Sequence, residues 1–377
     1  MKIVLAPDSY KGSLTSPEVV QVMQKAILDY CNECTVIPKP MADGGEGTVD
    51  ALFASSSGKR IEVTCTGPLG EKIPTYYAIT EDETAIIEVA NIAGLVQVPP
   101  SKRNPDLTTT YGLGEVMKDA LDKGCTSFVI GLGGSATNDG GLGFLQALGV
   151  QFFDEDGKKV GIFGKDIMSV HEVRFDRIDP RLKKAKIKVA CDVDNPLYGE
   201  KGASVVYGPQ KGAKPKQIER YDKAFRRYAS LIEQKQGKVL SNVKGAGAAG
   251  GLGFAFLVLD AELVSGAKLV AETSALEEAI RNADLVITGE GKSDEQTLYG
   301  KAPGYVADVA KGVGVPVILI SGSIGDDSDT LRTKFDGCFS IITEPLTIEE
   351  CMKEAKTLLY NQTKRIIHFI FSLTSWK

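Results

Sequence analysis

Both ends of the chain alternate short apolar strands with amphipathic helices, and this alternation restricts the possible folds more than any other feature. The segment "KIVLAP" (2–7) is typical of a buried strand, and Ser16-Pro17 behind it predicts a helix start with Ser16 as the N-cap. The last third repeats the pattern in "DLVITGE" (284–290), "YVADVAKG" (305–312), "VPVILISGS" (315–323) and "FDGCFSI" (335–341). Such alternation predicts a parallel sheet to which both chain ends contribute strands.

The region after residue 60 has a different pattern. Three extended segments follow one another without a helix between them: "RIEVTCTG" (60–67), "IPTYYAIT" (73–80) and "TAIIEVA" (84–90). They predict an antiparallel element, and 377 residues exceed the usual size of one domain. We therefore expect two α/β domains, with the active site in the cleft. One is a Rossmann-like domain of residues 1–60 and 284–377, and the other is a mixed-sheet domain of residues 61–283 inserted in it. The stretch 207–237 should form a charged helical pair on the surface.

Charge and cysteine usage exclude several classes of function. The formal net charge is −5 and the basic residues are scattered, so we expect no nucleic-acid partner. No apolar run approaches the roughly 18 residues of a membrane span, and the first residues lack a signal-peptide core, so we expect a cytoplasmic protein with no membrane partner. Cys31 and Cys34 form a C-x-x-C, but the chain has only two histidines and this pair follows a helix instead of opening one. A zinc or redox role is therefore disfavoured.

The stretch "VIGLGGSATNDGG" (129–141) places a glycine-rich turn directly behind an apolar strand. Glycines let a backbone approach an anionic ligand, so an anion site is natural here. The spacing Gly131-x-Gly133-x-x-Ala136, with Asp154 further on, also satisfies the dinucleotide fingerprint. That fingerprint is weak evidence, because residues 245–250 match it without a strand in front. The hydroxyl, amide and carboxylate groups at 135–139 suit phosphates and a metal better.

A second polar loop follows the strand "DLVIT" (284–288). The residues "GEGKS" (289–293) end as a P-loop ends, but Val286 stands where that motif needs its first glycine, so the motif fails. Glu290, Lys292 and Asp294 nevertheless lie at the carboxyl end of a predicted parallel strand. Ligands of α/β sheets bind at that edge.

Six segments together closely resemble the bacterial type I glycerate kinase family, nearly over the whole chain and in the family's order. They are "APDSYKGSLTSPEV" (6–19), "PMADGGEGTVDAL" (40–52), "GLGGSATNDGG" (131–141), "ACDVDNPLYG" (190–199), "GAGAAGGLG" (245–253) and "DLVITGEGKSDEQTLYGKAP" (284–303). The chain departs from the family at Tyr10, where a Phe is usual, and in the apolar end "RIIHFIFSLTSWK" (365–377).

The resemblance implies two α/β domains and transfer of phosphate from MgATP to a hydroxyl of D-glycerate, with 2-phosphoglycerate as the favoured product. ATP and Mg²⁺ are then the expected cofactors and D-glycerate the small-molecule partner, and a homodimer stays open. The alternative is an NAD(P)-dependent oxidoreductase that uses the 131–136 loop as its fingerprint. That alternative explains only one of the six segments.

Phosphoryl transfer needs cations, a metal held by carboxylates, and a base that aligns the attacking hydroxyl. We assign Asp192 as the base and Lys11 as the catalytic cation. The remaining assignments are nucleotide binding by Gly133, Gly134, Ser135, Thr137, Asn138, Asp139 and Lys292, substrate binding by Ser9, Asp43, Arg103 and Thr109, and metal binding by Glu290, Asp294 and Asp194.

Each of these assignments has a purely structural alternative. Lys11 and Lys292 can be solvated lysines, and Asp43 with Glu46 can belong to a tight glycine turn. Asp192 and Asp194 can belong to a turn that Asn195-Pro196 completes.

Overall fold

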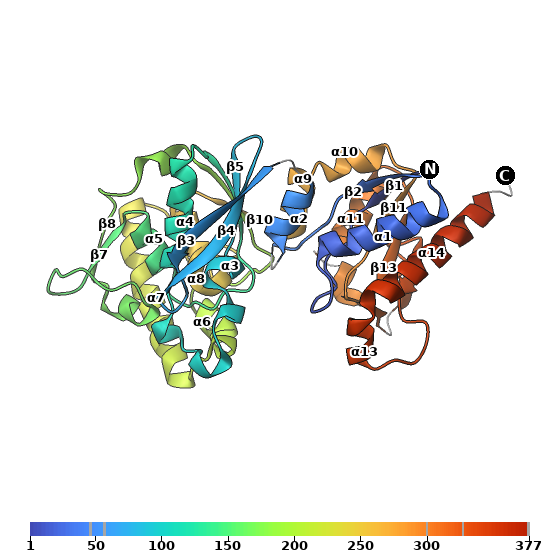
Figure 1. Cartoon of the computed structure of the whole chain (residues 1–377). Helices are drawn as coiled ribbons and strands as arrows, with labels where there is room; N and C mark the ends of the chain where they lie inside the picture. Colours follow the sequence, from blue (N-terminus) through green and yellow to red (C-terminus); the bar gives the residue numbers. More distant parts are fainter. Residues whose placement is uncertain (45–46, 56–57, 299–300, 326–327, 375–377) are drawn as a thin grey trace. The chain divides into compact units, whose positions relative to one another are not determined.

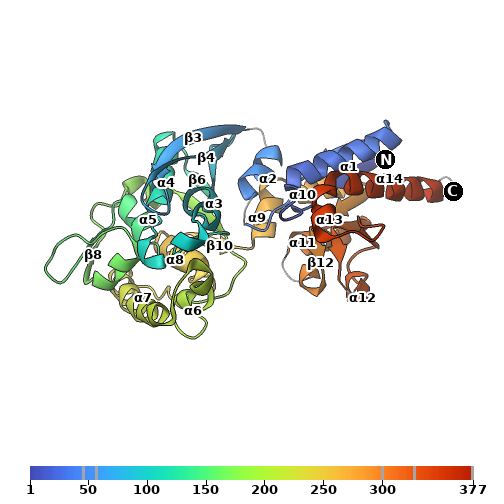
Figure 2. The same cartoon turned by 60° about the horizontal axis from the view of Figure 1, so that its bottom comes forward.

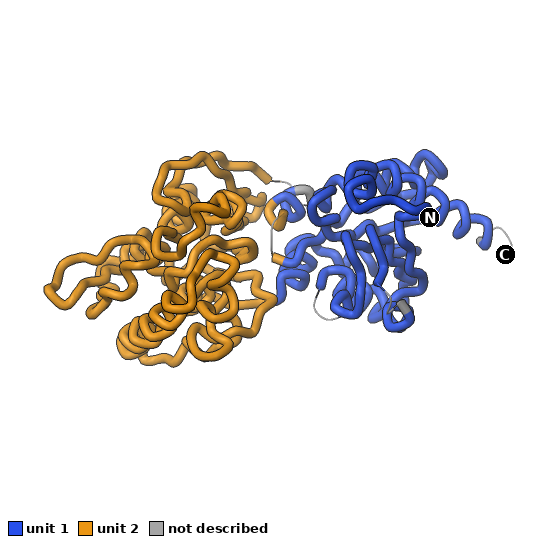
Figure 3. Tube along the Cα trace, turned by 90° about the horizontal axis from the view of Figure 1, so that it is seen from below, with its two compact units in different colours: residues 1–43, 50–57, 265–377 blue, residues 44–49, 58–264 orange. Residues whose placement is uncertain are grey.

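The computed structural model describes residues 1–44, 47–55, 58–298, 301–325 and 328–374. The chain divides into two compact units (Figure 3). Unit 1 comprises Met1–Asp43, Asp50–Ser57 and Ser265–Lys377, and unit 2 comprises Gly44–Val49 and Gly58–Val264. After unit 2 the chain therefore re-enters unit 1 at Ser265, whereas the sequence predicted that it would do so at residue 284.

Unit 1 contains a parallel sheet to which both chain ends contribute, as predicted (Figure 1). Among the described residues its spatial order is β15 (Gly337–Ser340), β13 (Val317–Ser321), β11 (Leu285–Thr288), β1 (Lys2–Leu5) and β2 (Thr35–Pro38). The strand from the N-terminus lies inside the sheet between β11 and β2, with Val4 in register with Val286 on β11. Its apolar residues Ile3 to Leu5 are fully buried, which is why the strand needs no polar alternation.

Helices cover this sheet, and the first begins one residue earlier than predicted. The N-cap of α1 (Ser16–Tyr30) is Thr15, whose hydroxyl accepts the Glu18 N–H while the Glu18 carboxylate accepts the Thr15 N–H. Ser16 as N-cap was therefore wrong, because this capping box involves Thr15 and Glu18. The remaining helices of unit 1 are α9 (Gly266–Thr273), α10 (Leu276–Arg281), α11 (Ala302–Gly312), α12 (Ser328–Leu331), α13 (Ile348–Lys353) and α14 (Ala355–Thr374).

Residues 365–374 of the apolar C-terminal segment form the end of α14, which lies beside α1 (Figures 1 and 2), and residues 375–377 lie outside the described residues. Ile366 and Ile367 are buried, whereas Phe369 remains 56% exposed. Tyr30 at the end of α1 contacts the His368 ring, with 3.1 Å between its hydroxyl and Nδ1. The unusual terminal sequence thus packs one face of its helix against α1 and leaves part of the other in solvent.

Unit 2 is built on a mixed sheet (Figure 1). Its order among the described residues is β10 (Glu262–Val264), β9 (Lys186–Ala190), β6 (Ser127–Gly131), β5 (Thr84–Glu88), β4 (Lys72–Thr80) and β3 (Gly58–Thr66). The three extended segments predicted after residue 60 are β3, β4 and β5, and they pair antiparallel as expected. From β5 to β10 the pairing is parallel.

The helices of unit 2 are α3 (Ala90–Ala93), α4 (Tyr111–Asp122), α5 (Leu142–Ala147), α6 (Ala203–Tyr207), α7 (Pro215–Gln236) and α8 (Ala248–Val258). A short antiparallel pair, β7 (Gln151–Phe153) and β8 (Glu172–Arg174), and the boundary helix α2 (Thr48–Ser55) complete the main elements. The predicted surface pair at 207–237 was wrong, because α7 buries Tyr221, Phe225 and Tyr228 in the core. None of the described helices is both long and apolar enough for a transmembrane span.

Candidate functional site

The loops that follow β1 and β11 bring carboxylates of unit 1 together. The two strands are neighbours in the sheet, and the Asp8 N–H donates to the Gly289 carbonyl at 2.8 Å. Burial, together with the carboxylates of Asp43 and Glu290, raises the pKa of Asp8 to about 7. Ser9 lies beside this group and donates its N–H to Asp8 Oδ1 at 2.6 Å. Carboxylates are therefore concentrated at this edge of the sheet. Their oxygen atoms are the kind of ligand that binds a hard divalent cation.

Glu290 is the buried member of this group, and its 9% exposure leaves little contact with solvent. Its carboxylate accepts hydrogen bonds from the hydroxyls of Ser293 at 3.1 Å and Thr297 at 2.6 Å. Lys301 lies 3.5 Å away, but the lysine is one-third exposed, so the pair compensates the charge only in part. The hydroxyls of Ser293 and Thr297 thus fix one carboxylate oxygen of Glu290. The group of Asp8, Asp43 and Glu290 remains rich in negative charge.

The side chains of the other two metal ligands predicted from the sequence have contacts of their own. Asp294 accepts the Gln296 N–H at 3.0 Å, which is the role of a turn cap. Asp194 belongs to unit 2, where its exposed carboxylate pairs with Lys244 at 2.9 Å. Within the described ranges, no three His, Cys, Asp or Glu residues have an arrangement that could hold a metal. The carboxylates that act on Asp8 are those of Asp43 and Glu290, so the metal set of Glu290, Asp294 and Asp194 stays a prediction from the sequence.

The predicted cations of unit 1 lie in solvent. Lys11 follows Tyr10 in the loop after β1 and is exposed, and Lys292 in β12 (Lys292–Ser293) is exposed as well. The Tyr10 hydroxyl donates to the Ile320 carbonyl at 2.7 Å, so the Tyr that replaces the family's Phe gains a buried partner. Both lysines are free to reach an anionic ligand, and both equally fit the solvated alternative.

The glycine-rich loop of unit 2 leaves the end of β6 and is held by its backbone. The Gly133 N–H donates to the Gly44 carbonyl at 3.1 Å, and the Ala136 N–H donates to the Ala93 carbonyl at 2.8 Å. Gly134 is exposed, has a φ of +71°, and accepts the Leu95 N–H at 2.7 Å. Because the Gly133 N–H is already used within the fold, it cannot serve a phosphate in this conformation. The exposed surface of the loop centres on Gly134.

Three predicted nucleotide ligands are enclosed by protein. The side chains of Thr137, Asn138 and Asp139 are fully buried. Asp139 accepts hydrogen bonds from the Thr110 N–H at 2.9 Å, the Thr110 hydroxyl at 2.7 Å and the Gly141 N–H at 3.1 Å. Burial raises the pKa of Asp139, and these bonds oppose that effect. Of the other two side chains, Asn138 donates its amide to Ser204 Oγ at 3.0 Å, whereas Thr137 Oγ1 is buried without a hydrogen-bond partner in the described chain. A direct contact of these three side chains with a nucleotide stays a prediction from the sequence.

Two predicted substrate ligands are also engaged elsewhere. The Thr109 hydroxyl donates to the Ile162 carbonyl at 2.6 Å, and the residue is fully buried, so its prediction as a substrate ligand is corrected. Arg103 is partly exposed, and its Nε donates to the Val98 carbonyl at 3.3 Å. The guanidinium therefore keeps donors for a ligand, whereas the threonine does not.

The glycine turn around Asp43 is tied down by a carboxylate that the sequence did not single out. Glu88 at the end of β5 is 1% exposed, and it accepts the Gly47 N–H at 2.9 Å and the Val49 N–H at 3.2 Å. Glu46 lies outside the described residues. Glu88 is the last residue of the apolar strand "TAIIE". A carboxylate at the end of such a strand is the sequence signal by which this residue could have been predicted.

Asp192 follows β9, which neighbours β6 in the sheet. Gly131 at the end of β6 is in register with Ala190 at the end of β9, so the glycine loop and the Asp192 loop leave the same edge. The Asp192 side chain is exposed. Asn195 stabilises this loop, because its carbonyl oxygen accepts the Tyr207 hydroxyl at 2.6 Å and its amide donates to the Lys201 carbonyl at 2.8 Å. An exposed carboxylate on a fixed loop fits the predicted base, and it fits the turn alternative too.

Lys211 is the residue of this region that sequence reasoning missed. It was counted among surface charges, yet it is only 2% exposed, and its Nζ donates to Ser135 Oγ at 3.0 Å and to the Thr137 carbonyl. Burial lowers the pKa of Lys211 to about 7, although the nearby Asp139 opposes the shift. The signal that could have marked it is the tight turn formed by the glycines on either side, Gly208 and Gly212.

Lys211→Met should change how stability depends on pH. The folded-state pKa of Lys211 lies below its ordinary value of 10.5, so between about pH 7 and 10.5 the unfolded chain binds more protons than the folded chain. The wild type should therefore gain stability relative to the Met variant as the pH rises through this window. Denaturant unfolding of both proteins at several pH values measures the difference, and a constant difference would contradict a buried lysine of lowered pKa.

The Cys31-Cys34 pair shows no sign of redox chemistry. The cysteines of the described chain are free thiols, and burial raises the pKa of Cys34 to about 11. A thiol of raised pKa is a poor nucleophile at neutral pH, which agrees with the structural role expected from the sequence.

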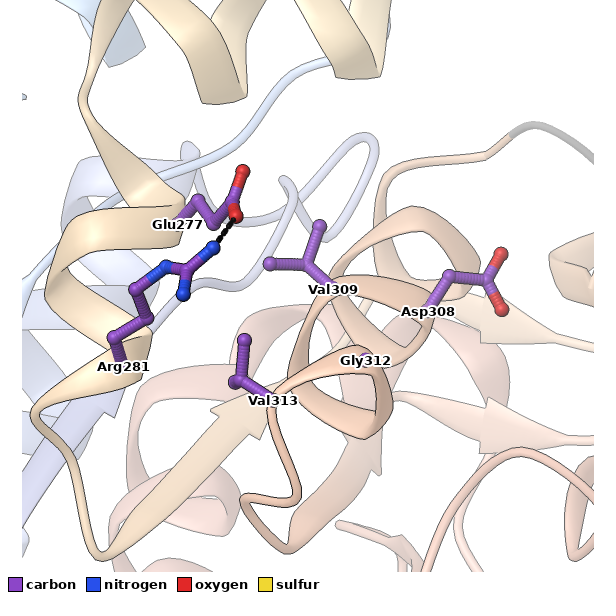
Figure 4. Close-up of a pocket in the computed structure, with 6 residues that line it drawn as sticks. All are labelled: Glu277, Arg281, Asp308, Val309, Gly312 and Val313. Carbon is purple, nitrogen blue, oxygen red and sulfur yellow. Dashed lines mark hydrogen bonds and ion pairs between the residues drawn. The ribbon is translucent and has the colours of Figure 1, made fainter.

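A depression of about 590 Å³ lies between α10 and α11 (Figure 4). Glu277 and Arg281 line one side and form an exposed pair, with 2.5 Å between Nη2 and Oε1. Asp308 and the apolar Val309 and Val313 line the other side. The depression contains none of the predicted site residues, and its charged groups face solvent. It is a surface groove of unit 1 and not the candidate site.

The chain belongs to the glycerate kinase family, whose sequence model matches residues 3–371. This membership places it among kinases, the enzymes that transfer phosphoryl groups. It is 43% identical to the glycerate kinase of Halalkalibacterium halodurans, over 97% of each chain, and 45% identical to the glycerate 2-kinase of Escherichia coli, over 94% of each chain. The crystal structure of a protein provisionally named glycerate kinase 2, from Salmonella typhimurium LT2, superimposes with a TM-score of 0.91 at 41% identity, covering 100% of this chain and 99% of that one. The comparisons give no support to the oxidoreductase alternative.

Proposed function

We propose that the protein transfers the γ-phosphate of MgATP to a hydroxyl of D-glycerate, with the 2-hydroxyl favoured. The observation that carries this proposal is the family match over residues 3–371, together with the relative from Escherichia coli that is named a glycerate 2-kinase. The loops of both units are chemically suited to it, since one concentrates carboxylates and the other presents glycine backbone.

The glycine loop is the proposed nucleotide site. Gly134 is the residue through which it would first contact phosphates, because Gly134 is exposed and the Gly133 N–H is engaged with Gly44. Ser135, also predicted from the sequence, is buried and its hydroxyl accepts a hydrogen bond from Lys211. A backbone without a Cβ at Gly134 lets phosphate oxygens come close to peptide groups. Lys292 of unit 1, which is exposed, is the cation proposed for nucleotide phosphates.

The carboxylates of unit 1 are the proposed magnesium ligands. Asp8, Asp43 and Glu290 carry the hard oxygen atoms that Mg²⁺ prefers, and one or two of them would bind the ion, since Mg²⁺ usually takes only one or two carboxylates and completes its shell with substrate phosphates and waters. Burial and the carboxylates of Asp43 and Glu290 raise the pKa of Asp8, and a bound cation would favour its ionised form. When bound, Mg²⁺ neutralises phosphate charge that develops during transfer.

The remaining roles concern glycerate. Asp192 would accept the proton of the attacking hydroxyl, and Lys11 would stabilise the charge of the phosphoryl group in transfer. Ser9 and Arg103 would bind the glycerate hydroxyl and carboxylate, since a guanidinium binds carboxylates through two parallel hydrogen bonds. Each of these side chains is exposed or partly exposed in the described chain.

An assay of ADP release coupled to D-glycerate tests the function. We expect release that requires both D-glycerate and magnesium, and no binding of NAD by calorimetry. Absence of glycerate-dependent ADP together with tight NAD binding would reverse the proposal in favour of an oxidoreductase. The proposed location is the cytoplasm, and light scattering distinguishes a monomer from a homodimer.

A further inference from the structure

The Lys211 side chain reaches the glycine loop from its buried side. Lys211 ends the short helix η6 (Pro209–Lys211), and the chain turns back at once through Gly212, whose φ is +85°. A Cβ on Gly212 would stand 2.1 Å from the Arg103 carbonyl oxygen, so only glycine allows this close return. The turn places the lysine stem inside the unit instead of in solvent.

The ammonium group holds two points of the loop at once. Its acceptors are Ser135 Oγ at 3.0 Å and the Thr137 carbonyl at 2.6 Å. Ala136, between them, donates its N–H to the Ala93 carbonyl at 2.8 Å. The segment 135–137 is therefore fixed through three consecutive residues, and two of these three anchors come from one side chain.

Burying a lysine in order to hold a loop costs free energy. Desolvation disfavours its charge, as the lowered pKa shows, and two hydrogen bonds offset that cost only in part. Asp139, the other charged group that acts on Lys211, is largely satisfied by donors from Thr110 and Gly141. A positive charge in a region of low dielectric beneath an exposed glycine also attracts an anion on the outer side.

We propose that Lys211 is a positioning residue for nucleotide binding: it fixes Ser135 and Thr137 from below so that Gly134 faces the phosphates in a binding-competent conformation. The inference rests on the proposed kinase function. Lys211 touches the loop and not the nucleotide, so its loss should act on ATP affinity and leave binding of D-glycerate unchanged.

Lys211→Met tests this role, because the substitution keeps an unbranched side chain, one atom shorter, and removes both charge and hydrogen bonds. We expect the KM for ATP to rise about ten- to 100-fold, which is the effect of roughly one lost charged hydrogen bond, with the KM for D-glycerate unchanged. Lys214→Met, at the exposed N-cap of α7, is the matched control and should bind ATP like the wild type. Direct calorimetry with a non-hydrolysable ATP analogue should show the same loss as the KM.

The outcomes separate the two proposals. Absence of glycerate-dependent ADP release by the wild type would refute the proposed function, and this inference with it. Normal wild-type activity with an unchanged KM for ATP in Lys211→Met would refute only the positioning role, as would an equal rise in both KM values. If the Met variant does not fold, Lys211→Gln retains a neutral donor, and the same split between the two KM values decides.

Discussion

Asp192→Asn should lower kcat by about 10² to 10⁴ while leaving the KM for ATP nearly unchanged. A base that receives the hydroxyl proton acts in the transition state, and asparagine keeps the size of aspartate but cannot accept that proton. Steady-state kinetics with varied ATP and D-glycerate measure both parameters. The effect should be large because Asp192 is exposed on the loop after β9, where it can meet a substrate.

Two other roles for Asp192 predict different results. If Asp192 holds magnesium, the Asn variant should recover activity as magnesium is raised, and its apparent ATP affinity should fall with its rate. If it is a turn residue, kcat should survive and stability should drop by about 1 kcal/mol, as after loss of a cap. Asp194→Asn is the matched control, since that exposed carboxylate only pairs with Lys244. An unchanged kcat in Asp192→Asn would remove the residue from catalysis.

Gly134→Val should weaken ATP binding about 100-fold, because small misplacements in a phosphate site carry costs of that size. The φ of Gly134 is +71°, a conformation that a β-branched residue adopts only with strain, and a Cβ there would stand 3.3 Å from the Ala90 Cβ, so the loop that is proposed to hold phosphates would have to shift. Calorimetry with an ATP analogue measures the loss, and circular dichroism checks that the variant remains folded.

Gly157→Val is the control for backbone strain alone. Gly157 has a φ of +74°, lies in an exposed turn, and has nothing within 4 Å of a Cβ. It should lose stability to a degree similar to Gly134→Val and keep its ATP affinity. If the Gly134 variant bound ATP as tightly as the wild type, the loop would be a structural turn and the nucleotide would have to bind elsewhere.

Much of the fold could be predicted because its signals are local. Apolar runs in the sequence predict the strands β1, β11 and β13, and turn residues between extended segments predict the hairpin of β3 and β4. The return to unit 1 at Ser265 could not be predicted in this way, because α9 and α10 carry no mark that assigns them to one core or the other. Which core receives a helix is a property of tertiary packing.

Predictions for the candidate site are weakest where burial decides the role. Asp139 and Thr109 have residue types suited to ligands, yet their hydrogen bonds to the backbone enclose them. Lys211 looks like one more surface lysine in a basic stretch, and only the turn at Gly212 sends it inward. Composition shows which polar groups are present, but the direction of a side chain depends on the backbone around it.

The most direct test of the proposed function is phosphorus NMR of the product formed from D-glycerate and MgATP. We expect the ATP signals to give way to those of ADP and one new phosphate monoester, whose coupling to a single proton identifies 2-phosphoglycerate. Asp192→Asn should form the same ester far more slowly. An ester coupled to two protons would move the reaction to the 3-hydroxyl, and the absence of any phosphorylated glycerate would contradict the proposed kinase activity.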